Sequence, residues 1–503
     1  MKIINTDVLI VGTGASGLFA ALHLPPDKQV LMITKDQTEN SDSYLAQGGI
    51  CVLRDEDDYD SFMEDTLKAG HYENRRESVD IMIRSSRSVI DQLIRWGVDF
   101  AMKDGQLDYT REGCHSKARI LYHEDVTGKE ITSKLLAAVR GLPNVTILEY
   151  TTMIDLVAKD NRCLGIIARD EAGGYIAIEA AQTILASGGV GGLYERSTNF
   201  PHLTGDAIAI ARRHGIALEH IDYVQIHPTS LYTTHPGRSF LISESVRGEG
   251  ARLYGKDGRR FASEVLPRDV MTAEIRKQMA KDGMPYVWLD MTVLGKDTIF
   301  RHFPNIYQKC LEEGFDVTKD WIPVVPAQHY FMGGIHVDSF SKTTMDGLYA
   351  VGETSCNGVH GKNRLASNSL LESLVFAERA AGQVSQQIRR PAARPEGEFE
   401  WLGERAVQAL KKEDVRWRRS IRPKYYKKWN GSGAHNERTE FDYDEAACRS
   451  DIDDGPAGRY QQRGRVDERR HARSLPGRSR AAQQGRRRHR WLAGLCQSVY
   501  AAG

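Results

Sequence analysis

Residues 7–24 read DVLIVGTGASGLFAALHL, and this stretch decides the fold. The aliphatic run from Asp7 to Val11 has the composition of a strand that is buried on both faces. A glycine-rich turn follows, then a segment with helical spacing that stops before two prolines. A second aliphatic run, QVLMIT, occupies residues 29–34. The order strand, turn, helix, strand predicts the first unit of a parallel, doubly wound sheet.

The turn carries three glycines in register, Gly12, Gly14 and Gly17. The first permits a tight turn, the second lets the backbone approach a pyrophosphate, and the third lets helix and strand pack closely. The helix N-terminus then offers free N–H groups to the phosphates. A turn that merely favours glycine explains one glycine and not three, so the pattern predicts a dinucleotide site. We expect one dinucleotide, because no second GxGxxG stands inside a strand–helix unit.

The end of the second strand departs from the usual pattern. An acid that binds ribose hydroxyls is expected there, but the sequence reads Thr34-Lys35-Asp36. Either Asp36 binds the ribose one position late, or Lys35 lies along the nucleotide and the ribose is held by other groups.

Later segments indicate the rest of the architecture. Residues 183–194 and 347–355 are predicted to return to the first sheet as strands, and the second of them carries Glu353, an acid well placed for a ribose. Residues 203–215 predict a helix. Residues from about 220 to 330 are rich in His, Arg and aromatics and show no alternating βα rhythm, which predicts a second domain closing over the first. The fold class is therefore α/β, a Rossmann-like domain with an inserted α+β capping domain.

Composition narrows the class of protein. The 503 residues include 68 Lys and Arg and 67 Asp and Glu, so net charge favours neither a nucleic acid nor a membrane as partner. Seven cysteines form no CxxC pair, and an odd number argues against a disulfide framework. The N-terminus enters a strand without an export signal, and no apolar run approaches the ~20 residues that span a bilayer. We expect a cytoplasmic protein with no membrane span and no nucleic-acid partner.

Several short segments concentrate residues that could bind or catalyse beside glycines or prolines. They are TREGCHS (110–116), VQIHPTSL (224–231), ESVRGEGARL (244–253), EVLPRDV (264–270), PAQHYFMGGI (326–335) and GKNRLASNSLLESL (361–374). No HxH, HExxH or Cys/His cluster has metal-ligand spacing, and no GxSxG elbow indicates a hydrolase. The remaining set of cations and neutral donors suits a small dicarboxylate, whose carboxylates need positive or hydrogen-bonding partners once removed from water. The candidates are His115, His227, His329, Arg247, Arg268, Arg364, Glu112, Glu244 and Glu249.

These motifs together resemble the fumarate reductase/succinate dehydrogenase flavoprotein superfamily. The resemblance rests on GTGASG, SYLAQGGI, TREGCHS, LASGG, TGDAIAIA, IHPT, RGEGARL, PRD, HYFMGGI, GLYAVGE and HGKNRLASNSLLESL, and it is collinear from residue 1 to about 412. Within the superfamily the sequence is most similar to the L-aspartate oxidase family. That similarity implies FAD as cofactor and hydride transfer from the Cα of L-aspartate to flavin N5. It also implies iminoaspartate as product, O₂ or fumarate as the acceptor that reoxidises the flavin, and a place as the first step of NAD biosynthesis. Hand-off of iminoaspartate to quinolinate synthase is the expected partnership, and a soluble fumarate reductase is the alternative function.

The resemblance also implies residue roles. In respiratory succinate dehydrogenases a histidine in the segment that wraps the flavin binds FAD covalently, but here that position is Asp42 and no histidine lies between residues 24 and 70. We therefore expect non-covalent FAD. Its expected contacts are Gly12, Gly14, Ala15, Ser16, Gly17, Lys35, Asp42, Ser43, Tyr44, Leu45, Ala46, Gln47, Gly48, Gly49, Asp206, Glu353, Ser369 and Leu370.

Five further residues are expected at the substrate. Glu112 would bind the α-ammonium, because an anion there both binds aspartate and discriminates against succinate. His227 and His329 would hold the carboxylates and Arg364 would clamp the distal one. Arg268 matches the proton-transfer arginine of the superfamily. Because a guanidinium is not normally deprotonated in proteins, we expect Arg268 to orient the substrate and stabilise charge during aspartate oxidation.

The expected domains are a FAD-binding domain in two parts (1–219 and 332–395), the capping domain (220–331) and a final segment (396–503). In that segment a remnant helix precedes an irregular, arginine-rich tail. Residues 423–490 contain only four of Ile, Leu, Val, Phe or Met, too few to offset the entropy of ordering. A basic nucleic-acid-binding tail, a natural disordered tail and a reading-frame change in the gene are three interpretations. The abrupt change in composition favours the last, which leaves open an inactive product as a second class of function.

Overall fold

The glycine turn of residues 12–17 lies at the carboxyl edge of a seven-stranded sheet in the computed structural model. This structure describes residues 1–264, 266–388, 397 and 399–408. The strand order is β7-β2-β1-β10-β9-β8, with β17 beside β10. These strands are β7 (Val145–Leu148), β2 (Val30–Ile33), β1 (Lys2–Val11), β10 (Tyr175–Leu185), β9 (Arg162–Arg169), β8 (Thr152–Lys159) and β17 (Leu348–Ala350).

The predicted parallel sheet is confirmed, with one extension. Strands β7, β2, β1, β10 and β17 are parallel, whereas β9 and β8 continue the sheet in antiparallel pairs. The runs at 7–11, 29–34 and 347–355 all contribute strands to it. The run at 183–194 contributes only its first residues, because β10 ends at Leu185 and Gly188 then takes a φ of +75°, which a continuing strand does not use.

Alternation along the strands explains why the sheet is buried on both faces. Val8 and Ile10 belong to one hydrophobic core, while Leu9 and Val11 belong to the core on the opposite face. Because successive side chains of a strand point to opposite faces, a continuous aliphatic run fills both cores.

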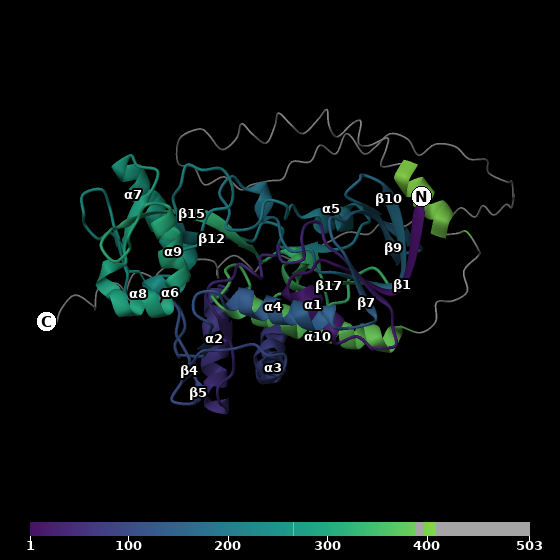
Figure 1. Cartoon of the computed structure of the whole chain (residues 1–503), viewed down its shortest axis with the longest axis horizontal. Helices are drawn as coiled ribbons and strands as arrows, with labels where there is room; N and C mark the ends of the chain where they lie inside the picture. The colour runs from purple at the N-terminus through teal and green to yellow at the C-terminus, as the bar shows by residue number, and fades with distance from the viewer. Residues whose placement is uncertain (265, 389–396, 398, 409–503) are drawn as a thin grey trace, which may run out of the picture. The chain divides into compact units, whose positions relative to one another are not determined.

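Helices cover the first face of the sheet, as Figure 1 shows for α1, α4 and α10. The helices of this layer are α1 (Ala15–Leu22), α2 (Tyr59–Ala69), α3 (Arg76–Arg95), α4 (Thr127–Arg140) and α10 (Asn368–Gln387). The other face carries α5 (Asp206–Arg213) and a small sheet of β11 (Leu218–Glu219), β16 (Gly334–His336) and β18 (Ser355–Cys356). The helix predicted at 203–215 is α5.

Short elements complete this part of the chain. Two two-stranded sheets are formed by β3 (Ile50–Cys51) with β6 (Ile120–Leu121) and by β4 (Met102–Lys103) with β5 (Gln106–Leu107). The 3₁₀ turns of this part, among the described residues, are η1 (Glu56–Asp58), η2 (Gly191–Leu193) and η4 (Gly352–Thr354), while η3 (Thr292–Leu294) lies in the insert between residues 219 and 332.

Residues 399–408 are helical and pack on the antiparallel extension of the sheet. Phe399 and Val407 contact a cluster that includes Val157 on β8 and Ile167 on β9. This segment covers part of the remnant helix predicted after residue 396. The predicted arginine-rich tail lies outside the described residues.

The insert between the two parts of the first sheet builds a sheet of its own. Its antiparallel order is β12-β15-β14-β13. The strands are β12 (Val224–Leu231), β13 (Arg252–Tyr254), β14 (Val287–Asp290) and β15 (Ile322–Phe331), and the helices are α6 (Glu244–Gly248), α7 (Arg268–Asp282), α8 (Lys296–His302) and α9 (Pro304–Glu312). A separate hydrophobic core fills this part. The absence of a βα rhythm in the sequence therefore has a structural counterpart, while the exact domain boundaries remain a prediction.

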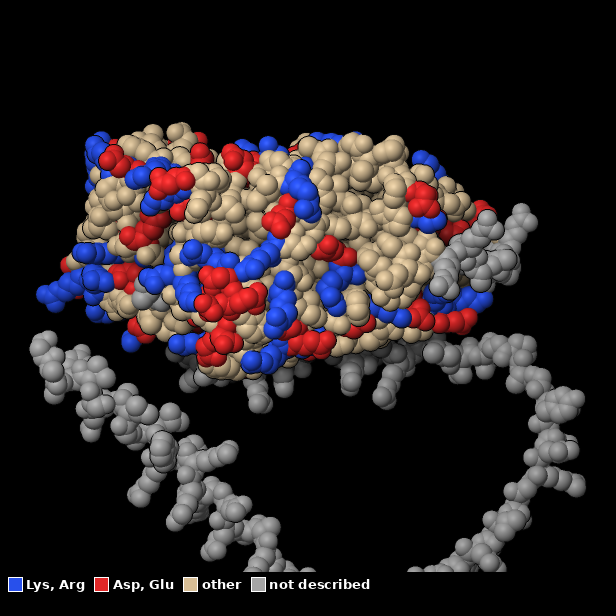
Figure 2. All heavy atoms as spheres, turned by 90° about the horizontal axis from the view of Figure 1, so that it is seen from below, with Lys and Arg blue, Asp and Glu red and all other residues tan. Residues whose placement is uncertain are grey.

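The surface carries charges of both signs. On the face shown in Figure 2, Lys and Arg side chains are interspersed with Asp and Glu. Among the described residues, no helix is both long enough and apolar enough to cross a bilayer.

The buried carboxylate of Asp125 connects the part of the fold built on the seven-stranded sheet with the part built on the four-stranded sheet. Asp125, in the loop between β6 and α4, is 2% exposed and accepts hydrogen bonds from the backbone N–H groups of Asn305 (3.2 Å) and Ile306 (2.8 Å). The Asn305 side-chain amide adds a third bond at 2.7 Å. Asp125 therefore caps the first turn of α9 from across the contact between the two parts of the fold.

Replacing Asp125 with Ala should lower the free energy of unfolding by about 1–2 kcal/mol, because it leaves the first N–H groups of α9 without a partner in a buried contact. Thermal unfolding followed by circular dichroism measures the effect, and the exposed α3 carboxylate Asp91 gives a control in Asp91→Ala. Equal midpoints for the two variants would contradict the role of Asp125 as an anchor.

Candidate active site

One pocket is lined both by the glycine turn and by residues of the four-stranded part. It holds about 1650 Å³, measured out to open solvent. Its walls come from both parts of the fold and from segments far apart in the chain: residues 11–14 and 16, 40–43 and 45–49, 186–188, 198–199, 202–207, 238, 241 and 243–244, together with single residues such as Glu112, His227, Arg268, His329, Glu353 and Arg364.

The glycine turn forms one wall of the pocket, where neighbouring backbone segments approach each other closely. Gly12 has a φ of +114°, and a Cβ built on it would lie 2.1 Å from the carbonyl oxygen of Ala186. A Cβ on Gly17 would lie 2.2 Å from the carbonyl oxygen of Gly12. Only glycine allows these approaches, and they set the N-terminus of α1 directly on the end of β1. Gly14 at the N-cap has no side chain to cover the N–H groups of the first turn, of which, among the described residues, only that of Ala15 is bonded to a side chain, the Ser43 hydroxyl, so the turn can still receive an anion.

The structure places the two candidates at the end of β2, Lys35 and Asp36, in different surroundings. Lys35 lines the pocket, and its ammonium donates to the carboxylate of Asp206 (2.7 Å), the hydroxyl of Thr204 and the carbonyl of His202 (both 2.9 Å). Asp36 does not line the pocket and accepts instead from the backbone N–H of Gln37. Lys35 therefore lies where a nucleotide would pass, and its partner Asp206 comes from the start of α5.

The segment at 40–49 crosses the pocket with little room for side chains. Gly49 cannot carry a Cβ, which would lie 2.3 Å from the carbonyl oxygen of Leu121. The hydroxyl of Ser43 accepts a hydrogen bond from the backbone N–H of Ala15 at 3.1 Å, which joins the segment to the first turn of α1. The small residues of SDSYLAQGG thus let the backbone itself form a pocket wall.

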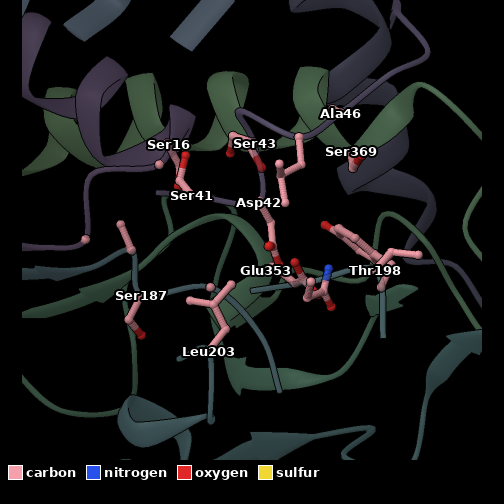
Figure 3. Close-up of a pocket in the computed structure, with 18 of the residues that line it drawn as sticks. Ser16, Ser41, Asp42, Ser43, Ala46, Ser187, Thr198, Leu203, Glu353 and Ser369 are labelled. Carbon is pink, nitrogen blue, oxygen red and sulfur yellow. The ribbon is translucent and has the colours of Figure 1, made fainter. Parts of the chain in front are cut away.

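Two buried carboxyl groups lie close together near the middle of the pocket, as Figure 3 shows for Asp42 and Glu353. Burial raises the pKa of Asp42 to about 7. Burial, with the nearby charge of Asp42, raises the pKa of Glu353 to about 8. Asp42 accepts from the backbone N–H of Phe200 at 2.9 Å, and its Oδ2 has no partner among the described residues. An unpaired buried acceptor here matches a ligand that brings hydroxyl or N–H donors.

Two arginines reach the far end of the pocket from different sheets. Arg268, at the start of α7, donates to Glu244 (2.5 Å) and to the side-chain carbonyl of Gln225 (2.7 Å). Arg364 donates to the hydroxyl of Ser369 at 2.7 Å and to the same Gln225 oxygen at 3.3 Å. Burial lowers the pKa of Arg364 to about 10, so the guanidinium stays charged at neutral pH. Gln225 therefore fixes both cations relative to each other.

Two neutral imidazoles stand beside these cations. The rings of His227 and His329 meet edge to face at 5.1 Å between centroids. Burial lowers the pKa of both well below its usual value, and the positive charge of Arg268 lowers both further. Nδ1 of His329 bonds to the hydroxyl of Thr198 at 2.7 Å, while Nε2 of His227 has no partner among the described residues. The pair can bind carboxylates as neutral hydrogen-bonding groups.

Glu112 brings a negative charge to this end of the pocket. It is 4% exposed, and its carboxylate accepts from the hydroxyls of Ser367 (2.6 Å) and Ser245 (2.8 Å). Burial raises the pKa of Glu112 above its usual value, and the charge of Glu244 adds to the rise. Glu244 behaves oppositely, because the charges of Arg268 and Arg247 outweigh its own burial and hold its pKa below the usual value.

Comparison with known proteins gives the family. Residues 7–370 match the family model of the FAD binding domain. The chain is 48% identical over 383 residues to L-aspartate oxidase of Clostridium perfringens, covering 76% of this chain and 87% of that protein. It is 49% identical over 387 residues to L-aspartate oxidase of Clostridium acetobutylicum, covering 76% and 89%.

This chain belongs to the L-aspartate oxidase family.

A solved structure shows the same fold in a related class of flavoprotein. The quinol fumarate reductase of E. coli superposes with a TM-score of 0.77 at 29% identity, over 82% of this chain and 75% of that one. The predicted superfamily and the fold class are thereby confirmed, and FAD is the cofactor of this L-aspartate oxidase family member.

The pocket residues fit FAD. The turn of residues 12–14 offers backbone N–H groups and no side chains where a pyrophosphate must approach, which is the chemistry of a dinucleotide cradle. Gln47 and Asp42 each leave one buried oxygen without a partner among the described residues, as acceptors for the donors of a flavin and its ribityl chain. Residues 24–70 contain no histidine that could form a covalent bond with the flavin ring, so we propose that FAD is bound non-covalently.

Most predicted contacts line this pocket. They are Gly12, Gly14, Ser16, Lys35, Asp42, Ser43, Leu45, Ala46, Gln47, Gly48, Gly49, Asp206, Glu353, Ser369 and Leu370 for the cofactor, and Glu112, His227, Arg268, His329 and Arg364 for the substrate. Ala15, Gly17 and Tyr44 do not line it: the first two pack α1 against β1. Among the other candidates His115, Arg247 and Glu249 also lie outside its walls, and Glu249 pairs with His302 at 2.9 Å.

Several lining residues were not predicted from the sequence. Thr198, Arg238, Ser243 and Tyr330 line the pocket, and the ring of Tyr330 stacks under the Arg364 guanidinium at 4.5 Å. Tyr330 follows His329 directly, so the aromatic residue in HYFMGGI was the available signal for it. The others carry no local pattern, because the fold alone brings them to the pocket.

Replacing Gly12 with Ala should abolish FAD retention, because the new Cβ would overlap the Ala186 carbonyl and move α1 off the pocket. Gly173→Ala is the matched control: Gly173 also has a positive φ (+84°), but nothing lies within 4 Å of its Cβ position. The control carries only the cost of left-handed backbone, about 1–2 kcal/mol. The ratio of flavin to protein absorbance after purification measures the outcome, and a yellow Gly12→Ala protein would contradict it.

Proposed function

We propose that this chain oxidises L-aspartate to iminoaspartate with FAD as the bound electron acceptor. Membership in the L-aspartate oxidase family supports the proposal, and so does a pocket that joins a dinucleotide cradle to a cluster of carboxylate-binding groups. NAD biosynthesis is the process in which this reaction supplies the first intermediate.

The two substrate carboxylates meet cations held from both sheets. Arg364 and Arg268 present two guanidinium groups whose positions Gln225 fixes, and His227 and His329 add neutral imidazoles. Buried guanidinium–carboxylate pairs are strong and directional because the low local dielectric strengthens the attraction. The set is therefore suited to a dicarboxylate held at both ends.

Glu112 is the observation that carries the assignment to aspartate. A pocket for succinate or fumarate alone needs only positive charge and hydrogen-bond donors, and a buried carboxylate there weakens the binding of such a ligand without preventing it. Among the described residues Glu112 receives two hydroxyl donors and forms no ion pair, and burial raises its pKa. An α-ammonium supplies a counter-charge, so Glu112 favours an amino dicarboxylate over succinate.

The Cα–H bond breaks and its electron pair leaves with the hydrogen as hydride, the ammonium loses a proton to solvent, and a C=N bond forms between Cα and nitrogen. FAD, when bound, supplies the two-electron acceptor for this step. The protein's part is to orient Cα and to keep water away from it. Arg268 donates to Glu244 and Gln225, so its role here is to orient and stabilise the substrate carboxylate, since a guanidinium is a donor and not an acceptor of protons.

The electron acceptor and the recipient of the product complete the proposal. Fumarate fits the same carboxylate-binding groups as the substrate, and O₂ is the alternative acceptor. Iminoaspartate hydrolyses in water, so its direct use by quinolinate synthase is the partnership we propose. A soluble fumarate reductase is the second candidate function, and fold similarity to quinol fumarate reductase favours it, but Glu112 argues against it.

Purified protein should be yellow, and anaerobic L-aspartate should bleach its visible flavin band while succinate leaves it unchanged. Absorbance spectroscopy in a sealed cuvette measures this, with re-oxidation by added fumarate or air as the second step. Bleaching by succinate and not by aspartate would favour the fumarate reductase alternative. A yellow protein that neither substrate bleaches would favour an inactive product.

Replacing Glu112 with Gln should weaken L-aspartate binding roughly 10- to 100-fold, because a charge-assisted bond to the ammonium is lost, while succinate binds as well or better. In the native protein aspartate affinity should fall as pH decreases through the raised pKa of Glu112, because only the ionised carboxylate attracts the ammonium. That acid limb should disappear in the variant. Glu249→Gln, which alters a carboxylate outside the pocket, is the control.

A further inference from the structure

Protein groups enclose the Glu112 carboxylate on three sides. The hydroxyl of Ser367 donates to one oxygen at 2.6 Å, and the hydroxyl of Ser245 donates to the other at 2.8 Å. The third side is the backbone of Gly48, where a Cβ would lie only 2.5 Å from Oε1 of Glu112. The fourth side is the pocket, which Glu112 lines.

Each serine is itself held so that its proton is directed to Glu112. Ser367 accepts a hydrogen bond from the backbone N–H of Gly49 at 3.1 Å, which leaves its hydroxyl proton for the carboxylate. The hydroxyl of Ser243 donates to that of Ser245 at 3.2 Å, with the same consequence. Two hydroxyls with fixed donor roles form a receptor for an anion, since a carboxylate accepts and does not donate.

Ser367 also occupies a strained backbone conformation. Its φ of +62° lies in the left-handed region, where a residue with a Cβ is uncommon. The strain persists because the carbonyl of Ser367 accepts from Cys51 (3.0 Å) while its hydroxyl bridges Gly49 and Glu112. Strain of this kind is retained at sites where the geometry it enforces is used.

The arrangement leaves acceptor capacity for a ligand. A carboxylate has about four lone-pair directions, and the two serines use one on each oxygen. The remaining directions are available to the hydrogens of an ammonium. The charged groups that act on Glu112 are Glu244, Arg268 and Arg364, and none of them donates a hydrogen bond to it.

We infer that Ser245 and Ser367 are specificity-determining positioning residues, which hold the Glu112 carboxylate in the orientation that accepts the α-ammonium of an amino dicarboxylate. This inference rests on the proposed function and adds to it the groups that set the preference for aspartate over succinate. Ser245 lies in α6 beside the four-stranded sheet, whereas Ser367 precedes α10 on the seven-stranded sheet. The receptor for the ammonium is therefore complete only when both parts of the fold contribute.

The test separates binding from reduction in the FAD-loaded protein. Anaerobic stopped-flow mixing at increasing L-aspartate concentration yields an apparent Kd and a limiting rate of flavin bleaching. Titration with succinate, followed by the perturbation of the flavin spectrum, yields the Kd of a ligand without an ammonium. Ser245→Ala should raise the apparent Kd for L-aspartate about tenfold and leave the Kd for succinate unchanged.

Two further variants distinguish positioning from a loss of structure. Ser245→Thr keeps the hydroxyl and should restore the native Kd for L-aspartate. Ser230→Ala is the matched control. Ser230 is a buried serine of the four-stranded sheet, and its hydroxyl donates to the carbonyl of Val325 at 2.7 Å, away from the pocket. It should change neither Kd. Ser367→Ala should repeat the selective loss from the other side of Glu112.

The pH dependence gives an independent readout. The hydroxyl of Ser245 favours the ionised form of Glu112, so its removal should shift the acid limb of aspartate binding to higher pH. Equal losses of aspartate and succinate binding in Ser245→Ala, or no loss of either, would overturn the inference. A native protein that L-aspartate does not bleach would instead overturn the proposed function, before any variant is compared.

Discussion

Close backbone contact at the carboxyl edge of the seven-stranded sheet is the constraint on which the rest of the structure depends. The turn at Gly12 passes so near the Ala186 carbonyl that no side chain fits between β1 and β10, and Gly17 lies equally close to the turn itself. Because α1 consequently starts on the edge of the sheet, its first turn lies at the pocket, where Ser16 lines the wall and the N–H of Ala15 bonds to Ser43. The segment at 40–49 and the carboxyl group of Glu353 then close the same space from other directions.

Two carboxylates at the far end of the pocket, Glu244 and Glu112, have different surroundings, and their pKa values shift in opposite directions. Glu244 lies between the positive charges of Arg268 and Arg247, so its charge is balanced within the protein and its pKa falls. Glu112 receives only hydroxyl donors, and burial raises its pKa. The carboxylate of Glu244 thus holds an arginine in position, whereas the carboxylate of Glu112 is left to pair with a cation of a ligand. We propose that this contrast, rather than the number of charges, gives the pocket a preference for an amino dicarboxylate.

The sequence predicted the elements whose signal is local. Three glycines in register and two aliphatic runs were enough for β1, α1 and β2, and the motif resemblance placed most lining residues. The choice between Lys35 and Asp36 could not be made locally, since the partner that holds Lys35 is Asp206, far along the chain. The antiparallel strands β8 and β9 and the cap from Asp125 to α9 were missed for a related reason: ordinary residues acquire these roles only through tertiary contacts.

Recognition in this site is divided between the two sheets for every part of the substrate. Arg268 belongs to the four-stranded part and Arg364 to the seven-stranded part, and Gln225 bonds to both. Glu112 is divided in the same way, since its hydroxyl donors come from α6 and from the residue before α10. In the proposed function a dicarboxylate would join the two parts through its carboxylates, and an ammonium would add a third link through Glu112. The ammonium would then bind where the two parts meet, so that selection of the substrate and exclusion of water from Cα depend on the same contacts.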